Sequence, residues 1–153
     1  WPSEKYAKVA KQLQDEKDVQ IILVGGEKDI PFSSEIAQTC LQPVFNFTGH
    51  LSLMETACVL SFADLVLTND TGVMHLANSQ KKQTVAIFGP TMKDLGFFPL
   101  EEISTVIENT NLKCRPCTHM GSNKCPKKHF KCMQDISADA VYQTISRLIG
   151  GLS

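Results

Sequence analysis

Short apolar runs alternate with helical stretches along the 153-residue chain, and this alternation constrains its fold more than any other feature. The run 19–24 is almost continuously apolar and β-branched, which is typical of a parallel strand covered on both faces. Further runs predict strands at 44–49, 65–68, 84–88 and 105–107. Because strands that alternate with helices form parallel crossover units, the predicted fold class is α/β, with a doubly wound parallel sheet.

Helix signals occupy the segments between these strands. Ser3 is a candidate N-cap, and Ser52 and Glu55 have the spacing of a capping box, which satisfies exposed backbone donors at a helix start. Gly150 and Gly151 provide a stop for the last helix. The predicted helices cover residues 3–16, 33–41, a segment that begins at 53, 72–79 and 137–149.

Length and composition limit the class of protein. The chain has the size of one domain, and its 42% hydrophobic and 20% charged residues are typical of a soluble globular protein. The net charge of -1 lacks the basic excess of nucleic-acid-binding proteins, so we expect no nucleic-acid partner. No apolar run approaches the roughly 18 residues needed to span a bilayer. The chain opens in a helical pattern without Met or a signal peptide, which predicts a missing upstream domain.

Residues that directly follow predicted strands are candidates for a binding site, because ligands of doubly wound sheets bind beyond the carboxyl ends of the strands. Asp70, Thr71, Gly72 and His75 follow one strand and open a helix. Free backbone N–H groups and the helix dipole favour an anion there, Thr71 adds a hydroxyl, and Gly72 lets a phosphate approach the backbone. The alternative is that Asp70 or Thr71 only caps the helix and that His75 is a packed histidine.

Two other strand ends carry weaker patterns. Gly25 and Gly26 follow the strand at 19–24 and permit either close approach of a ligand or an ordinary strand-to-helix turn. The pattern is not Gly-x-Gly-x-x-Gly, so a dinucleotide-binding site is not supported. Gly89-Pro90-Thr91, after the strand at 84–88, is by itself only a turn.

Six cysteines fall into two groups. Cys40 and Cys58 lie singly in apolar stretches and are expected to be buried structural thiols. The other four crowd into one segment, with His119 and His129 among them, and could wrap a tetrahedral zinc ion. Paired disulfides and free thiols are the alternatives. The candidate metal ligands are Cys114, Cys117, Cys125 and Cys132.

Two stretches together resemble glycosyltransferase family 9, the lipopolysaccharide heptosyltransferases. The first is 63–77, with its Asp-(Ser/Thr)-Gly-x-x-His core, and the second is 85–91, which ends in Phe-Gly-Pro-Thr. Three further segments are also similar to this family: Trp1-Pro2, residues 49–53 and the Cys-x-Pro-Cys segment that ends in Cys132-Met133.

The resemblance implies a GT-B glycosyltransferase, in which two Rossmann-like domains face each other across a cleft. Residues 1–153 would form the single C-terminal nucleotide-sugar-binding domain, which takes an ADP-heptose donor. The absent N-terminal domain would bind the lipid-linked core oligosaccharide acceptor and supply the catalytic base. The isolated chain is therefore expected to be inactive. The full-length protein would be cytoplasmic, and its lipid-linked acceptor would bring it to the periphery of the inner membrane.

The resemblance also implies roles for individual residues. Asp70, Thr71, Gly72 and His75 would hold the pyrophosphate and sugar of the donor. The nucleotide site would be lined by Gly25, Gly26 and Met54. Transfer to the lipopolysaccharide inner core would need no cofactor, and a zinc ion would be structural. The alternatives are a non-catalytic nucleotide-binding or zinc-stabilised interaction module, and a GT-B enzyme that uses a UDP-sugar.

Overall fold

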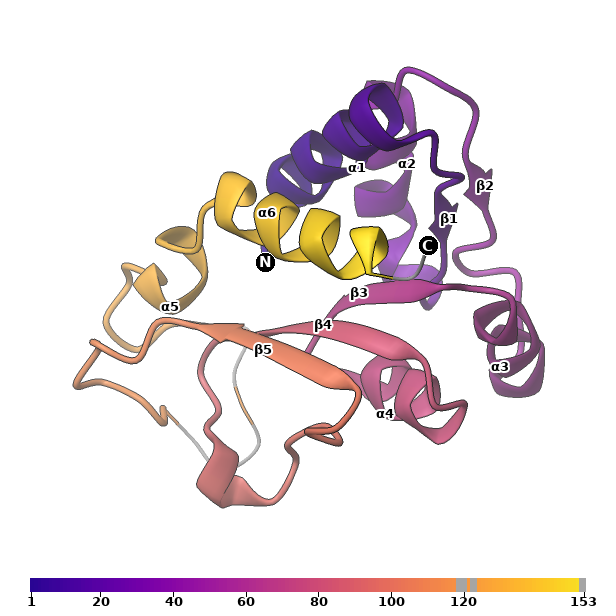
Figure 1. Cartoon of the computed structure of the whole chain (residues 1–153). Coiled ribbons are helices and arrows are strands. Elements are labelled where there is room, and N and C mark those ends of the chain that lie inside the picture. The colour runs from indigo at the N-terminus through magenta and orange to yellow at the C-terminus, as the bar shows by residue number, and fades with distance from the viewer. Residues whose placement is uncertain (118–120, 122–123, 152–153) are drawn as a thin grey trace. The chain divides into compact units, whose positions relative to one another are not determined.

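The computed structural model describes residues 1–117, 121 and 124–151 (Figure 1). These residues form two compact units. One unit, called the three-strand unit, contains Trp1 and Ala63–Ser137. The other, called the two-strand unit, contains Pro2–Phe62 and Ala138–Ser153. Each unit combines helices with strictly parallel strands, which agrees with the predicted α/β class.

The three-strand unit is built on β3 (Leu65–Asn69), β4 (Gln83–Phe88) and β5 (Ser104–Glu108), in the order β3-β4-β5 (Figure 1). Val85 of the central strand is in register with Leu67 on one side and Thr105 on the other. The unit also contains α4 (Gly72–Ser79), the short 3₁₀ helix η2 (Lys93–Leu95) and α5 (Lys131–Gln134). α4 packs on β3 and β4, and α5 contacts β4.

The core of this unit explains the continuous apolar pattern of β4. Met74, Ala86 and Phe88 are fully buried, and the ring centroids of Phe88 and Phe98 lie 4.8 Å apart. A parallel strand with a neighbour on each side and both faces covered must be apolar at successive positions. The prediction of a strand at 84–88 is therefore confirmed, and the structure shows that residues 84–88 of this strand are buried.

A buried asparagine joins α4 to the amino ends of β4 and β5. The Asn78 amide group donates to the hydroxyls of Thr84 and Ser104, each at 3.1 Å. Its carbonyl oxygen accepts from the Leu100 backbone N–H at 2.7 Å. Because Asn78 is only 5% exposed, these contacts replace the hydrogen bonds that it would form with water.

The two-strand unit pairs β1 (Ile22–Leu23) with β2 (Phe45–Asn46). Within it, α1 packs against α2 and α6, and Ala7, Ala10 and Ile36 form a buried apolar cluster at the α1–α2 contact. The helical elements are α1 (Ser3–Lys17), the 3₁₀ helix η1 (Glu27–Asp29), α2 (Ile30–Thr39), α3 (Leu53–Ser61) and α6 (Ala138–Gly150).

The strand predictions at 19–24 and 44–49 were too long. Only two residues of each are strand, although parallel hydrogen bonds from the N–H groups of Phe47 and Gly49 to the carbonyls of Leu23 and Gly25 continue the ladder. Ile22 is 36% exposed, so the expectation of burial on both faces was wrong for this run. The physical reason is that β1 and β2 form a sheet of two strands, which has no central strand.

Two predictions for single residues were also wrong. Pro2, not Ser3, is the N-cap of α1, and the Ser3 hydroxyl donates to the Glu35 carboxylate at 2.6 Å. Pro2 lacks an N–H and has a fixed φ, which suits a helix start. Cys58 is exposed on α3, so the expectation that it is buried was wrong, whereas Cys40 is half-buried and packs against the core cluster of α1 and α2. The capping box of Ser52 and Glu55 is confirmed.

The helices of the described part of the chain include none that is long and apolar enough to cross a membrane.

We predict that Asn78→Leu destabilises the protein by about 1–3 kcal/mol, because the buried Thr84 hydroxyl and the Ser104 hydroxyl lose their donor and the Leu100 N–H loses its acceptor. Urea denaturation followed by circular dichroism measures this change. Ser79→Ala, at an exposed position next to it on α4, is the control and should change stability by less than about 0.5 kcal/mol. Equal effects of the two substitutions would contradict the role given to Asn78.

Tyr142 on α6 donates a hydrogen bond to the Glu16 carboxylate on α1, and this bond is the main cause that lowers the pKa of Glu16. A lowered folded-state pKa gives stability that is present above the unfolded pKa and is lost as the pH falls through the folded one. Tyr142→Phe should therefore raise the pKa of Glu16, as measured by NMR titration. Gln143→Ala, an exposed substitution on the same helix, should leave this pKa unchanged.

Candidate functional site

The candidate site lies at the carboxyl edge of the three-strand sheet. β3, β4 and β5 are parallel, so the chain leaves all three strands at the same edge. Asp70 follows β3, Thr91 lies three residues beyond β4, and Glu108 is the last residue of β5. This is the edge at which open α/β sheets bind their ligands.

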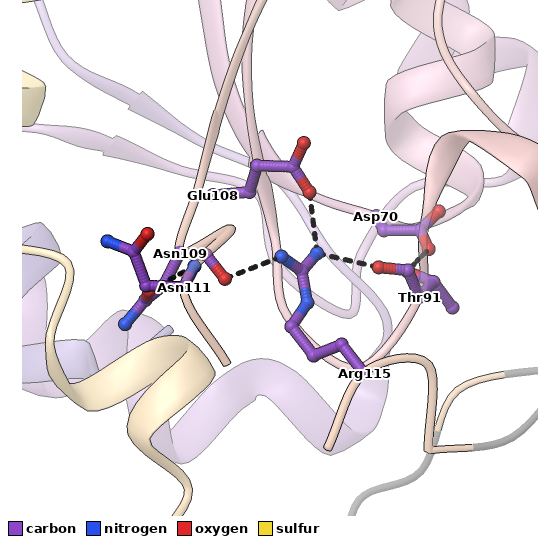
Figure 2. Close-up of polar contacts among 6 residues, drawn as sticks. All are labelled: Asp70, Thr91, Glu108, Asn109, Asn111 and Arg115. Carbon is purple, nitrogen blue, oxygen red and sulfur yellow. Dashed lines mark hydrogen bonds and ion pairs between the residues drawn. The ribbon is translucent and has the colours of Figure 1, made fainter. Parts of the chain in front are cut away.

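Asp70 is held by a side chain from the neighbouring strand end (Figure 2). The Thr91 hydroxyl donates to a carboxylate oxygen of Asp70 at 2.6 Å, and Thr91 is only 4% exposed. The Asp70 backbone N–H donates to the Ile87 carbonyl, which extends the β3–β4 ladder by one bond. Hydrogen bonds to an ionised acceptor are stronger than neutral ones, so this pair fixes the turn between β3 and α4.

The N-terminus of α4 follows directly. Thr71 is the N-cap residue, but its side chain makes no capping hydrogen bond, and its hydroxyl lies 3.3 Å from the Thr68 hydroxyl. The alternative that the Thr71 side chain caps the helix was therefore wrong. The Met74 N–H donates to the Thr71 carbonyl at 3.0 Å, whereas the N–H groups of Gly72 and Val73 come too early in the helix to have an acceptor within it. The helix dipole adds partial positive charge, so this end favours an anion.

The predicted ligand-binding residues of this segment are accessible. Thr71, Gly72 and His75 are exposed, and Asp70 is half-buried. A Cβ atom placed on Gly72 would meet no atom of the described residues within 4 Å. The structure thus brings these four residues together at an open helix N-terminus, and His75 is not a packed core histidine.

Arg115 completes the polar contacts at this edge and was not identified from the sequence. Its guanidinium donates to the Thr91 carbonyl at 2.7 Å, to the Asn109 carbonyl at 2.8 Å and to the Glu108 carboxylate at 2.6 Å (Figure 2). The side chain of Arg115 is 3% exposed. Its only sequence signal was a position inside the Cys-x-Pro-Cys pattern, which draws attention to the cysteines instead.

The remaining donor-site candidates lie in the two-strand unit. The Gly26 N–H donates to the Asp29 carboxylate at 2.9 Å, and a Cβ on Gly25 would lie 2.9 Å from the same carboxylate. The close approach of the Asp29 side chain in this turn is therefore enough to explain a glycine at position 25, without a ligand. Gly26 is exposed, a Cβ there would make only an ordinary contact, and Met54 on α3 is 77% exposed.

The cysteine segment belongs to the three-strand unit, and all four of its cysteines are free thiols. Cys132 is buried, the Cys114 sulfur lies 3.9 Å from His129 Nε2, and the Cys117 sulfur donates to the Cys114 carbonyl. A backbone hydrogen bond from Phe130 is the main cause that lowers the pKa of Cys125. His119 lies outside the described residues. Among the described residues, no group of three or more His, Cys, Asp or Glu side chains is arranged to hold a metal.

Comparison with known proteins identifies the family. Residues 1–128 match glycosyltransferase family 9 (heptosyltransferase), and the chain belongs to this family. It is 31% identical over 151 residues to lipooligosaccharide heptosyltransferase 2 of Campylobacter jejuni serotype O:6, covering 97% of this chain and 46% of the relative. It is 35% identical over 98 residues to lipopolysaccharide heptosyltransferase 2 of Escherichia coli K12, covering 61% of this chain and 28% of the relative.

Two solved structures confirm the Rossmann-like fold class. The E. coli ADP-heptose lipopolysaccharide heptosyltransferase II has a TM-score of 0.78 at 27% identity. The family 9 glycosyltransferase of Veillonella parvula has a TM-score of 0.77 at 25% identity. Each alignment covers 97% of this chain and 41% of the solved chain. The chain thus spans less than half the length of the relatives it matches.

Proposed function

We propose that this chain is the C-terminal, donor-binding half of a heptosyltransferase that uses ADP-heptose and acts on the lipopolysaccharide inner core. Membership of family 9 and the names of the relatives support this class of activity. The observation that carries the proposal is the open N-terminus of α4, where the Thr71 side chain leaves the helix uncapped and Gly72 faces free space. The acceptor and the catalytic base would belong to the N-terminal half, as the resemblance implies.

The geometry suits the pyrophosphate of a nucleotide sugar. Backbone N–H groups at the start of α4 and the Thr71 hydroxyl would donate to phosphate oxygens, and His75, one turn further along, would reach the same anion. These donors would stabilise the negative charge that develops on the departing nucleoside diphosphate. This role needs positioned donors only, so no cofactor is required for transfer.

Asp70 has a different role in this proposal. A carboxylate is a poor partner for phosphate, and one oxygen of Asp70 accepts the Thr91 hydroxyl. Asp70 would therefore fix the loop that enters α4, and it could contact the sugar hydroxyls. Of the residues proposed to line the nucleotide site, Gly26 and Met54 are exposed, whereas the half-buried Gly25 would act through the turn that it permits.

Calorimetric titration with ADP, UDP and ADP-heptose tests the donor site, on this chain and on the full-length protein. Thr71→Ala and His75→Ala should each weaken ADP binding roughly tenfold to a hundredfold, the size expected when one hydrogen bond to a charged group is lost. Ser79→Ala, at the other end of α4, is the matched control and should bind like the wild type. Its hydroxyl bonds to the Leu76 carbonyl within the helix.

The outcomes separate the candidate functions. Preference of the wild type for ADP over UDP, with ADP binding weakened in both variants, supports the proposal. Preference for UDP would assign the chain to a GT-B enzyme with another donor. A full-length protein that binds no nucleotide at millimolar concentration would contradict the donor site and favour an interaction module.

We also propose a structural rather than catalytic role for the cysteine segment, with zinc as its candidate ion. The support is the spacing of four cysteines, since four thiolates would leave zinc no open coordination position. The side chains of Cys114, Cys117, Cys125 and Cys132 would have to move closer together than in this structure to bind a zinc ion. Elemental analysis of protein purified without chelator tests this: about one zinc per chain, lost in Cys125→Ser with Cys132→Ser, is expected, and metal-free protein with unchanged stability would refute it.

A further inference from the structure

Arg115 carries a contact pattern that the donor site does not yet explain. It is a charged side chain that is 3% exposed, and its guanidinium donates to three oxygen atoms of two strand ends. Its Nε is buried without a hydrogen-bond partner among the described residues. Burial of an arginine is costly, because its charge cannot be removed by deprotonation and must be compensated by close partners. The free-energy cost of burying Arg115 indicates that this side chain does more than fill space in the core.

The three acceptors show what this side chain connects. The Thr91 carbonyl belongs to the loop after β4, whereas the Asn109 carbonyl and the Glu108 carboxylate lie at the end of β5. Arg115 therefore joins the ends of two neighbouring strands. A planar guanidinium can donate in several fixed directions at once, which an ammonium group on a flexible stem cannot reproduce.

The connection continues to the third strand through Thr91. The same residue that accepts from Arg115 with its carbonyl donates with its hydroxyl to Asp70, directly before Thr71 and Gly72 (Figure 2). Arg115, Thr91 and Asp70 thus form one row of contacts across the carboxyl edge. Thr91 is 4% exposed, so its contribution to a ligand site is made through Asp70.

We propose that Arg115 is a positioning residue for the donor site: through Thr91 it sets Asp70, and with it the backbone that presents the N-terminus of α4 to the donor. This inference rests on the donor-binding function proposed above. It places Arg115 outside contact with the donor, so its substitution acts by loosening donors that must be held in place before the ligand arrives.

Two variants each disrupt one of these contacts: the one between Arg115 and Thr91, or the one between Thr91 and Asp70. Arg115→Lys keeps the positive charge but loses the planar group, and Thr91→Val removes the hydroxyl bond to Asp70 while it retains the carbonyl that Arg115 contacts. In the full-length protein, each should weaken ADP binding about tenfold. The double variant should be no more than about twofold weaker than the weaker-binding single variant, because both act through the same path. Lys113→Met removes an exposed positive charge two residues away and should bind ADP like the wild type.

A second measurement separates positioning from general stability and does not need a ligand. The ¹⁵N–¹H resonance of Gly72 in the ligand-free protein should move in Arg115→Lys and Thr91→Val and stay in place in Lys113→Met, while the unfolding midpoints of all variants remain above the temperature of measurement. An unmoved Gly72 resonance, or losses of ADP affinity that add in the double variant, would overturn the inference. If wild-type protein binds no ADP, the donor function fails, and the Gly72 resonance still decides whether Arg115 positions this loop.

Discussion

The parallel pairing of β4 with β3 and β5 is the constraint on which the rest of the three-strand unit depends. Residues 84–88 of β4 are fully buried. The register of β4 with both neighbours brings the chain segments that follow the three strands to one edge of the sheet. Parallel strands require crossover connections, and the connection from β3 to β4 is α4, whose N-terminus must then lie at that same edge. The position of this helix N-terminus, where we propose that an anion binds, is thus a consequence of the pairing itself.

Polar side-chain contacts connect the three strand ends at this edge. Thr91 bonds to Asp70, and Arg115 bonds to Thr91 and to the end of β5. Buried charges are tolerated only when they are paired and hydrogen-bonded, so each member of this row restricts its neighbours. The exposed N-terminus of α4 therefore follows a residue, Asp70, that is held by hydrogen bonds to the neighbouring strand end. This is the arrangement that stabilisation of a departing diphosphate would require, and it fits the family to which the chain belongs.

Much of the fold could be predicted from the residues alone. β3, α4 and β4 lie within one or two residues of their predicted bounds, because strong apolar periodicity and the turn residues between them agree. The predictions at 19–24 and 44–49 extended too far, because an apolar run alone does not show how many neighbours a strand has. Ser3 was assigned as an N-cap because its hydroxyl suits that position, but Pro2 is the N-cap and Ser3 is the first residue of the helix.

For the site, the sequence by itself determined the order of the candidate residues: Asp70, Thr71, Gly72 and His75 follow a strand and open a helix. Only the tertiary structure decided what supports them. Arg115 lies 24 residues beyond Thr91, so their contact arises from packing between segments remote in sequence, whereas Asn109 and Glu108 lie six and seven residues before Arg115. Local patterns encode helix ends and strands because those depend on near neighbours. The contact of Arg115 with the Thr91 carbonyl has no such pattern, because these two residues meet only when the chain has folded.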